Sequence, residues 1–174
     1  MDLSTDTTGN KLIMLFVFDK MDFPIMEDTL LNICSSSNTW IPWMECRETI
    51  AQLLEAGFIY QSVHENKIYF SVTPDGRMCL SHFYTRIPSS LRAEITDYVK
   101  ENRMSFRRKQ EYFRNYYKNA DGSYTVQLKI MDPTQTTLEI KMNVSNRQTA
   151  KAVYNKWEEK AAQVFYSLHE QLID

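Results

Sequence analysis

Glycine is scarce in this sequence, which has only 4 in 174 residues, at positions 9, 57, 76 and 122. The chain therefore contains neither a P-loop nor a dinucleotide-binding fingerprint, because both motifs need closely spaced glycines around a phosphate. It also contains no GxSxG nucleophile elbow. The histidines, His64, His82 and His169, stand far apart and show no zinc-type spacing. We expect neither an enzyme nor a metal or cofactor site.

Cysteines and long apolar runs are also limited. The 3 cysteines, Cys34, Cys46 and Cys79, form no CxxC pair, which is typical of reduced, buried thiols in a cytoplasmic protein. The run LIMLFVF falls well short of the ~20 apolar residues that a membrane-spanning helix needs. The N-terminal sequence has no basic segment followed by an apolar core, as a secretion signal would. We therefore expect a cytoplasmic protein that has no membrane partner.

Charge is distributed unevenly along the chain. Residues 1–86 hold 6 Lys and Arg against 11 Asp and Glu, a net charge of −5. Residues 87–174 hold 14 against 11, a net charge of +3. Because phosphate neutralisation supplies much of the affinity for DNA, an acidic first half works against non-specific DNA binding.

The first half has the pattern of a winged helix. Apolar spacing predicts helices at residues 11–20, 25–34, 42–56 and 74–84, although 11–20 also fits a strand. Gly57 ends the third helix, and two strands follow at residues 58–63 and 67–72, joined by a tip of residues 64–66. The polar residues 1–9 are expected to fray. In this arrangement the third helix reads the major groove of DNA, and the hairpin is the wing.

The second half predicts a sheet covered by a long helix. Ile87-Pro88 interrupts the chain, which places a domain boundary between residues 86 and 87. The expected helices are residues 89–102 and 146–172, the latter opened by a capping box of Ser145 and Gln148. The expected strands are residues 106–117, 123–131 and 137–144. Period-two alternation in the last two strands indicates one buried and one solvated face.

The last helix is too long for this sheet to cover. It would span about 40 Å, whereas strands of ~8 residues reach only about 27 Å. The excess apolar stripe predicts a homodimer interface in domain 87–174, which could also hold a small-molecule effector. The alternative is that the helix packs across the first domain of its own chain. The interface candidates are Val153, Trp157, Val164, Phe165 and Leu168.

The sequence therefore predicts an α+β fold, in which an N-terminal winged helix-turn-helix is followed by a three-stranded antiparallel β-meander covered by a long C-terminal helix. The candidate DNA contacts are polar or cationic residues of the third helix, the wing and its base: Arg47, Thr49, Gln52, His64, Asn66, Lys67 and Arg77. The third helix also carries Glu45, Glu48 and Glu55, which oppose phosphate binding.

A second basic stretch, RMSFRRKQEYFRNYYK, interleaves cations with aromatic rings at residues 103–118. Its auxiliary candidates are Arg103, Arg107, Arg108 and Lys109. Cations between stacking rings suit a nucleic-acid backbone or another anion. On a strand, however, the same pattern also arises when Lys and Arg stems cover apolar surface and alternate rings fill the core.

The segments FPIMEDTLLNI, LLEAGFI, YFSVTPDGR and NADGSYTVQLKI resemble a bacterial family catalogued as a domain of unknown function, whose members look like winged-helix transcriptional regulators. In outline, the first half is also similar to PadR- and MarR-type regulators. The positions that carry this second resemblance are Leu53, Gly57, Phe58, Ile59, Tyr69, Val72, Thr73 and Gly76.

The resemblance implies a regulatory function. We therefore expect a DNA-binding transcriptional regulator that acts as a dimer, with double-stranded DNA and a second copy of the chain as its partners. The alternative is a winged-helix module that binds another protein and does not bind DNA.

Overall fold

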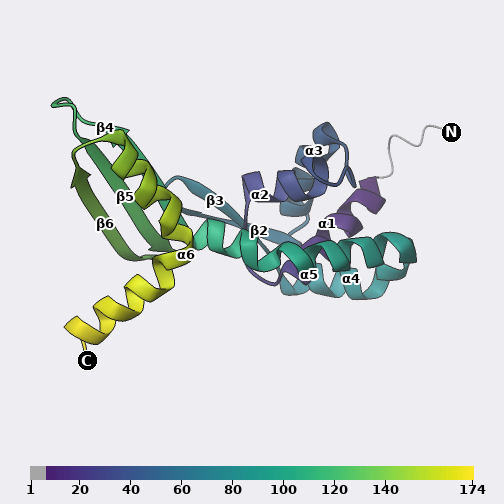
Figure 1. The fold of residues 1–174 in the computed structure, drawn as a ribbon. Coiled ribbons are helices and arrows are strands. Elements are labelled where there is room, and N and C mark those ends of the chain that lie inside the picture. Colours follow the sequence, from purple (N-terminus) through teal and green to yellow (C-terminus); the bar gives the residue numbers. More distant parts are fainter. Residues whose placement is uncertain (1–6) are drawn as a thin grey trace. The chain divides into compact units, whose positions relative to one another are not determined.

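The structure, a computed structural model, describes residues 7–174 and divides into two units, residues 7–104 and 105–174 (Figure 1). The sequence placed the boundary earlier, after residue 86. The first unit extends further because helix α5 (Ser89–Glu111) contributes to its core. Ile95 and Val99 of α5 are buried, and the ring of Tyr98 contacts Trp40 edge-on at 5.5 Å between centroids.

The first unit contains five helices and a small sheet, counted over residues 7–104. In chain order its elements are α1 (Thr7–Met21), β1 (Ile25–Met26), α2 (Glu27–Leu31), a π-helical turn (Asn32–Ser36), α3 (Trp43–Glu55), β2 (Ile59–His64), β3 (Lys67–Val72), α4 (Pro74–Phe83), a 3-10 turn (Tyr84–Arg86) and the start of α5. The alternative of a strand at residues 11–20 is wrong. Of the N-terminal segment expected to fray, residues 7–9 belong to α1, whereas residues 1–6 lie outside the described residues.

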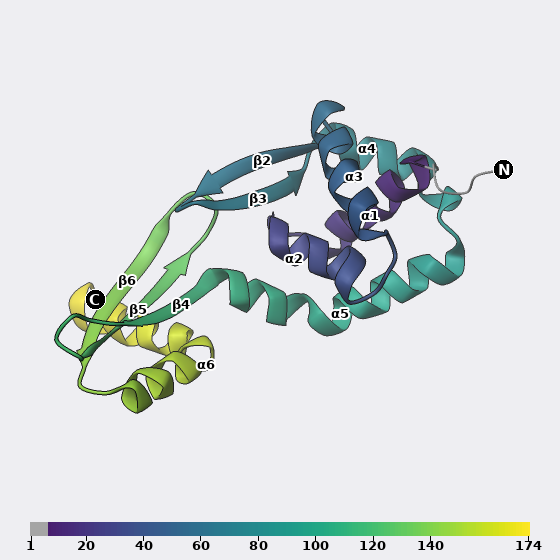
Figure 2. The same cartoon turned by 90° about the horizontal axis from the view of Figure 1, so that it is seen from above.

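The sheet of the first unit has a third strand that the sequence did not predict. Its order is β1-β3-β2, because Ile25 and Met26 pair antiparallel with Phe70 and Tyr69. A helix had been expected from residue 25. Ile25 is instead fully buried in an extended segment, and α2 begins only at Glu27. The helices followed by this sheet are compatible with a winged helix, and Figure 2 shows the β2–β3 hairpin extending away from α4.

A tight turn closes the hairpin. Glu65 and Asn66 have φ angles of 49° and 63°, a left-handed pair that matches the twist of two-residue hairpins.

Helix α1 is buried over most of its circumference and forms the centre of the first unit. Its buried residues are Leu12, Met14, Leu15, Phe16, Val17, Phe18 and Met21.

The second unit is an antiparallel meander with one long helix on one face. Its strands are β4 (Tyr112–Lys118), β5 (Tyr124–Met131) and β6 (Thr136–Val144), in the order β4-β5-β6. Helix α6 (Arg147–Leu172) packs on this sheet around a buried cluster of Val126, Leu128, Ala150, Trp157 and Ala161. The predicted α+β fold is confirmed.

Two local predictions in this region are wrong. Residues 106–111 were expected in a strand, but they form the last turns of α5, where Arg107 and Glu111 pair at the i,i+4 spacing of a helix. The expected capping box is also absent. Asn146 caps α6 instead, since its side-chain oxygen accepts a hydrogen bond from the backbone N–H of Thr149 at 2.8 Å. None of the helices within residues 7–174 is long and apolar enough to cross a membrane.

Candidate nucleic-acid interface

Helix α3 separates a buried face from an exposed one. Cys46, Thr49, Ile50 and Leu53 are buried, and this spacing holds the helix against the core of the first unit. Arg47 lies on the exposed side. Within residues 7–174, no carboxylate lies within ion-pair distance of its guanidinium, so this cation can meet a phosphate or a base edge.

The other two α3 candidates are less available than the sequence indicated. Thr49 is only 2% exposed, and its hydroxyl donates a hydrogen bond to the carbonyl of Glu45 at 2.7 Å. It belongs to the core, so we leave it out of the interface. The half-buried Gln52 donates from Nε2 to the carboxylate of Glu48 at 3.3 Å. Arg47 is therefore the main DNA-binding candidate of the helix.

Two apolar side chains on α3 were not among the candidates. Trp43 is 48% exposed and Met44 is 79% exposed, both in the first turn of the helix. Met44 could have been found from the helical period, because it points away from the face that Cys46 and Leu53 bury. An exposed Trp-Met pair is a surface that a protein partner could cover.

The wing presents a mixed surface. Asn66 is exposed at the tip, whereas His64 and Lys67 face each other across the hairpin and are half-buried. Tyr60 and Val63 of β2 are also exposed, at 52% and 60%. Lys67 is the only Lys or Arg within the hairpin strands and their turn, so the wing offers a phosphate backbone little positive charge.

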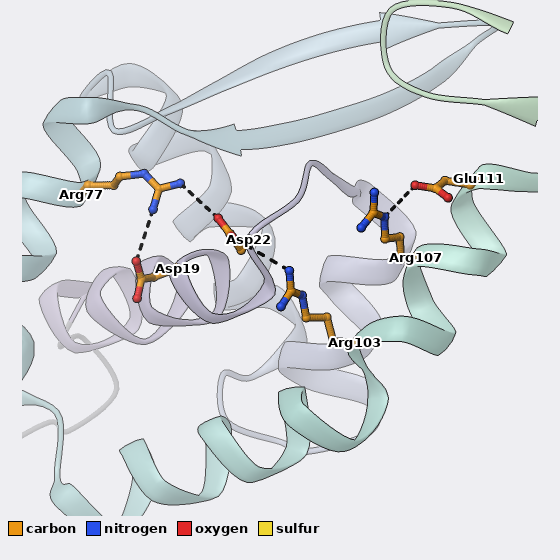
Figure 3. Close-up of polar contacts among 6 residues, drawn as sticks. All are labelled: Asp19, Asp22, Arg77, Arg103, Arg107 and Glu111. Carbon is orange, nitrogen blue, oxygen red and sulfur yellow. Dashed lines mark hydrogen bonds and ion pairs between the residues drawn. The ribbon is translucent and has the colours of Figure 1, made fainter. Parts of the chain in front are cut away.

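Arg77, a DNA-contact candidate, and Arg103, of the auxiliary basic stretch, instead take part in an ion-pair chain within the first unit (Figure 3). Arg77 of α4 pairs with Asp19 at 3.4 Å and with Asp22 at 3.8 Å, at the C-terminal end of α1. Arg103 of α5 pairs with the other oxygen of Asp22 at 3.9 Å. These ion pairs link α1, α4 and α5, and the carboxylates of Asp19 and Asp22 partly neutralise both arginines.

The remaining basic candidates lie on the last turns of α5. Figure 3 shows Arg107 directed at Glu111, with 2.7 Å between Nε and the carboxylate, and this contact raises the pKa of Arg107. Lys109 lies over the ring of Phe106 at 6.0 Å, and Arg108 is exposed. Because these residues are helical, they do not form the strand surface that the sequence indicated.

The five dimer candidates on α6 fall into two groups. Trp157 is only 3% exposed and belongs to the meander core, and Val153 and Val164 pack against that core. Phe165 and Leu168 are half-buried and lie further along the helix. Tyr166, between these two residues, and Leu172 and Ile173, beyond them, are 71–78% exposed. In Figure 1 this end of α6 extends past the sheet that its first half covers.

Two buried cysteines link the base of α3 to the π-helical turn. Cys34 and Cys46 are both fully buried, and a hydrogen bond between their thiols raises the pKa of Cys34 and lowers that of Cys46. Burial also raises the pKa of Cys34. Within residues 7–174, no group of three or more His, Cys, Asp or Glu side chains could hold a metal ion.

A family model described as a domain of unknown function (DUF4364) matches residues 10–172 of this chain. The match extends over both units. No curated protein and no solved structure matches the chain.

Proposed function

The chain belongs to the DUF4364 family, and we propose that it is a DNA-binding transcriptional regulator that acts as a homodimer. The observation that carries this proposal is Arg47, an exposed cation without a carboxylate partner among the described residues, on the third helix of a winged-helix arrangement. In helix-turn-helix proteins, such a helix enters the major groove and its side chains contact base edges.

The charges around Arg47 determine what kind of DNA binding is expected. Glu48 and Glu55 are also exposed on α3, and Arg77 is engaged by carboxylates. Few phosphates would therefore be neutralised, so affinity should depend weakly on salt compared with a strongly basic DNA-binding domain. Specific contacts from Arg47, with Gln52 in support, would then carry most of the discrimination between sequences.

The dimer is proposed to form through the outer part of α6. Phe165, Leu168 and Leu172 continue the apolar stripe past the meander core, which ends near Val164. A two-fold pair would cover these residues with the same surface of the second copy. A dimer also lets two copies of α3 contact adjacent half-sites, about 34 Å apart along the DNA.

The test is fluorescence anisotropy with DNA taken from upstream of the protein's own gene and with a scrambled duplex, at low and physiological salt. Arg47→Ala should weaken binding to the upstream DNA by about 1–3 kcal/mol if Arg47 contacts a base. Lys100→Ala is the matched control, since Lys100 is an exposed cation of the first unit on α5. Equal binding of wild type to both duplexes, or an unchanged isotherm for Arg47→Ala, would refute the proposal.

A second function, docking of another protein on the same surface, is favoured by the exposed Trp43 and Met44. Aromatic residues and methionine are enriched in protein interfaces, and Glu48 beside them disfavours phosphate. If neither duplex binds at low salt, this second function becomes the better proposal. A partner should then lose affinity for Trp43→Ala while keeping its affinity for Arg47→Ala.

A further inference from the structure

A surface cavity of about 660 Å³, open to solvent, lies in the first unit between α1, α4 and α5. Its apolar wall is formed by Phe16, Leu80, Tyr84 and Ala93. The charged groups around it are Asp19, Lys20, Arg77, Arg92 and Asp97. Pockets for small molecules typically measure about 300–1,000 Å³ and combine an apolar wall with a few polar groups. This cavity has the size and the lining of such a pocket.

Two cations of the cavity are held in place but not neutralised. The Lys20 ammonium lies 5.2 Å from the centre of the Phe16 ring, and the Arg92 guanidinium lies 5.2 Å from the centre of the Tyr84 ring. Within residues 7–174, neither cation has a carboxylate at ion-pair distance. Contacts with rings restrain a cation without cancelling its charge, so both groups can still pair with an anion.

Arg92 is also oriented for this purpose. Its Nε donates a hydrogen bond to the carbonyl of Ile87 at 3.1 Å, which fixes the plane of the guanidinium. The two terminal nitrogens remain to donate to a ligand, and their fork matches the two oxygens of a carboxylate. A positioned, partly buried arginine loses little side-chain entropy when a ligand binds.

The carboxylates around the cavity limit the charge that a ligand can carry. Asp19 is paired with Arg77, so this pair adds little net charge. Asp97 is exposed and has no cation at ion-pair distance among the described residues, so it would repel an anion. Lys20 and Arg92 therefore outweigh Asp97 by one positive charge, which suits a monoanion better than a dianion.

We propose that the cavity between α1, α4 and α5 binds a small organic monoanion, a carboxylate attached to an apolar body. Arg92 and Lys20 bind the carboxylate, and Phe16, Leu80 and Ala93 contact the apolar body. The proposal goes beyond DNA binding and does not depend on it, because none of the residues that would contact the ligand is a DNA-contact candidate.

The probes are 1-naphthoate and its uncharged counterpart 1-naphthamide, titrated into the full-length protein by calorimetry. Naphthoate should bind at least tenfold more tightly than naphthamide, because only the carboxylate can pair with the two cations. Lys20→Gln should weaken naphthoate binding about tenfold, the size of one charge-assisted contact. Asp97→Asn should strengthen it, whereas Lys100→Gln, on the same helix as Arg92 but outside the cavity lining, should leave it unchanged.

Ala93→Phe places a ring in the cavity and leaves all its charges in place, so it should weaken naphthoate binding while the far-UV circular dichroism stays that of the wild type. Equal affinity for the two probes, or unchanged affinity in both Lys20→Gln and Ala93→Phe, would overturn the proposal. Absence of naphthoate binding at millimolar concentration would do the same. The assay contains no DNA, so its failure is distinct from a failure of the proposed regulatory function.

Discussion

Replacing Gly76 by alanine should destabilise the first unit, although alanine is the better helix former and position 76 lies within α4. A Cβ atom at this position would lie 2.2 Å from the carbonyl oxygen of Phe58 and 2.9 Å from Cγ2 of Val72. The nearer atom is main chain and cannot rotate away. Either the hairpin or the start of α4 must therefore move.

The competing free energies can be compared from the structure. Alanine gains about 1 kcal/mol over glycine in a helix interior, whereas overpacking a well-filled site costs about 1–3 kcal/mol. A shift of α4 would also strain its cap, where Thr73 accepts from the Gly76 N–H at 3.1 Å and donates to the Gly57 carbonyl at 2.7 Å. Loss of an N-cap costs about 1 kcal/mol. We expect Gly76→Ala to lower the free energy of unfolding by about 2 kcal/mol.

Hydrogen exchange read by mass spectrometry is the suitable assay, because peptides report on each unit separately. Peptides from residues 58–83 should lose protection in Gly76→Ala, whereas peptides from β5 and β6 serve as an internal reference. Gly122→Ala is the control. A Cβ atom at position 122 would meet nothing within 4 Å, so only the φ angle of 87° is unfavourable for alanine. Gly122 belongs to the second unit, so this variant should leave the protection of residues 58–83 unchanged. Unchanged or increased protection of residues 58–83 would refute the steric argument.

Three further predictions concern the second unit. Trp157→Ala should destabilise the meander by about 3–5 kcal/mol in urea unfolding, equally at low and high protein concentration, because Trp157 fills the core rather than an interface. Asn146→Ala should cost about 1 kcal/mol in the same assay, whereas Ser145→Ala should cost less than about 0.5 kcal/mol. Hydrogen bonds from the side chain and backbone of Ser123 lower the pKa of Asp121 in the folded protein. The ionised Asp121 therefore stabilises the fold above its unfolded pKa of about 4. This stabilisation is lost as the pH falls through the lower, folded-state pKa. In an NMR titration, Ser123→Ala should move this pKa back toward its ordinary value.

The structure explains why Thr73 and Gly76 occur together in the winged-helix pattern. The resemblance to winged-helix regulators depended in part on Thr73 and Gly76, although around these residues the sequence predicted no more than a helix from residue 74. The structure shows that Thr73 caps α4 and bonds back to Gly57, while Gly76 allows the Phe58 carbonyl to approach the helix closely. Hydrogen bonds across 16 residues cannot be read from a local pattern.

The candidate site was predicted only in part. Helical period identified α3 and also places Thr49 on its buried face, three residues after Cys46 and four before Leu53. Thr49 was chosen as a DNA contact for its hydroxyl, and its burial was overlooked. Arg77 was chosen as a cation at the base of the wing, and Arg103 as part of the basic stretch interleaved with aromatic rings. Their carboxylate partners, Asp19 and Asp22, come from α1, so the loss of available charge depends on helix packing.

The sequence by itself determined the order of the helices and of the strands other than β1, the hairpin, and the alternation of the meander, because each depends on hydrophobic period and turn residues within a short window. Only the tertiary structure decided that strand β1 joins the wing sheet, that α5 continues through residue 111, and that Trp157 belongs to the core of the second unit. It also brought Lys20 and Arg92, which lie on α1 and α5, to one cavity. The reason is that burial and charge pairing depend on neighbours distant in the chain, and folding alone brings those neighbours together.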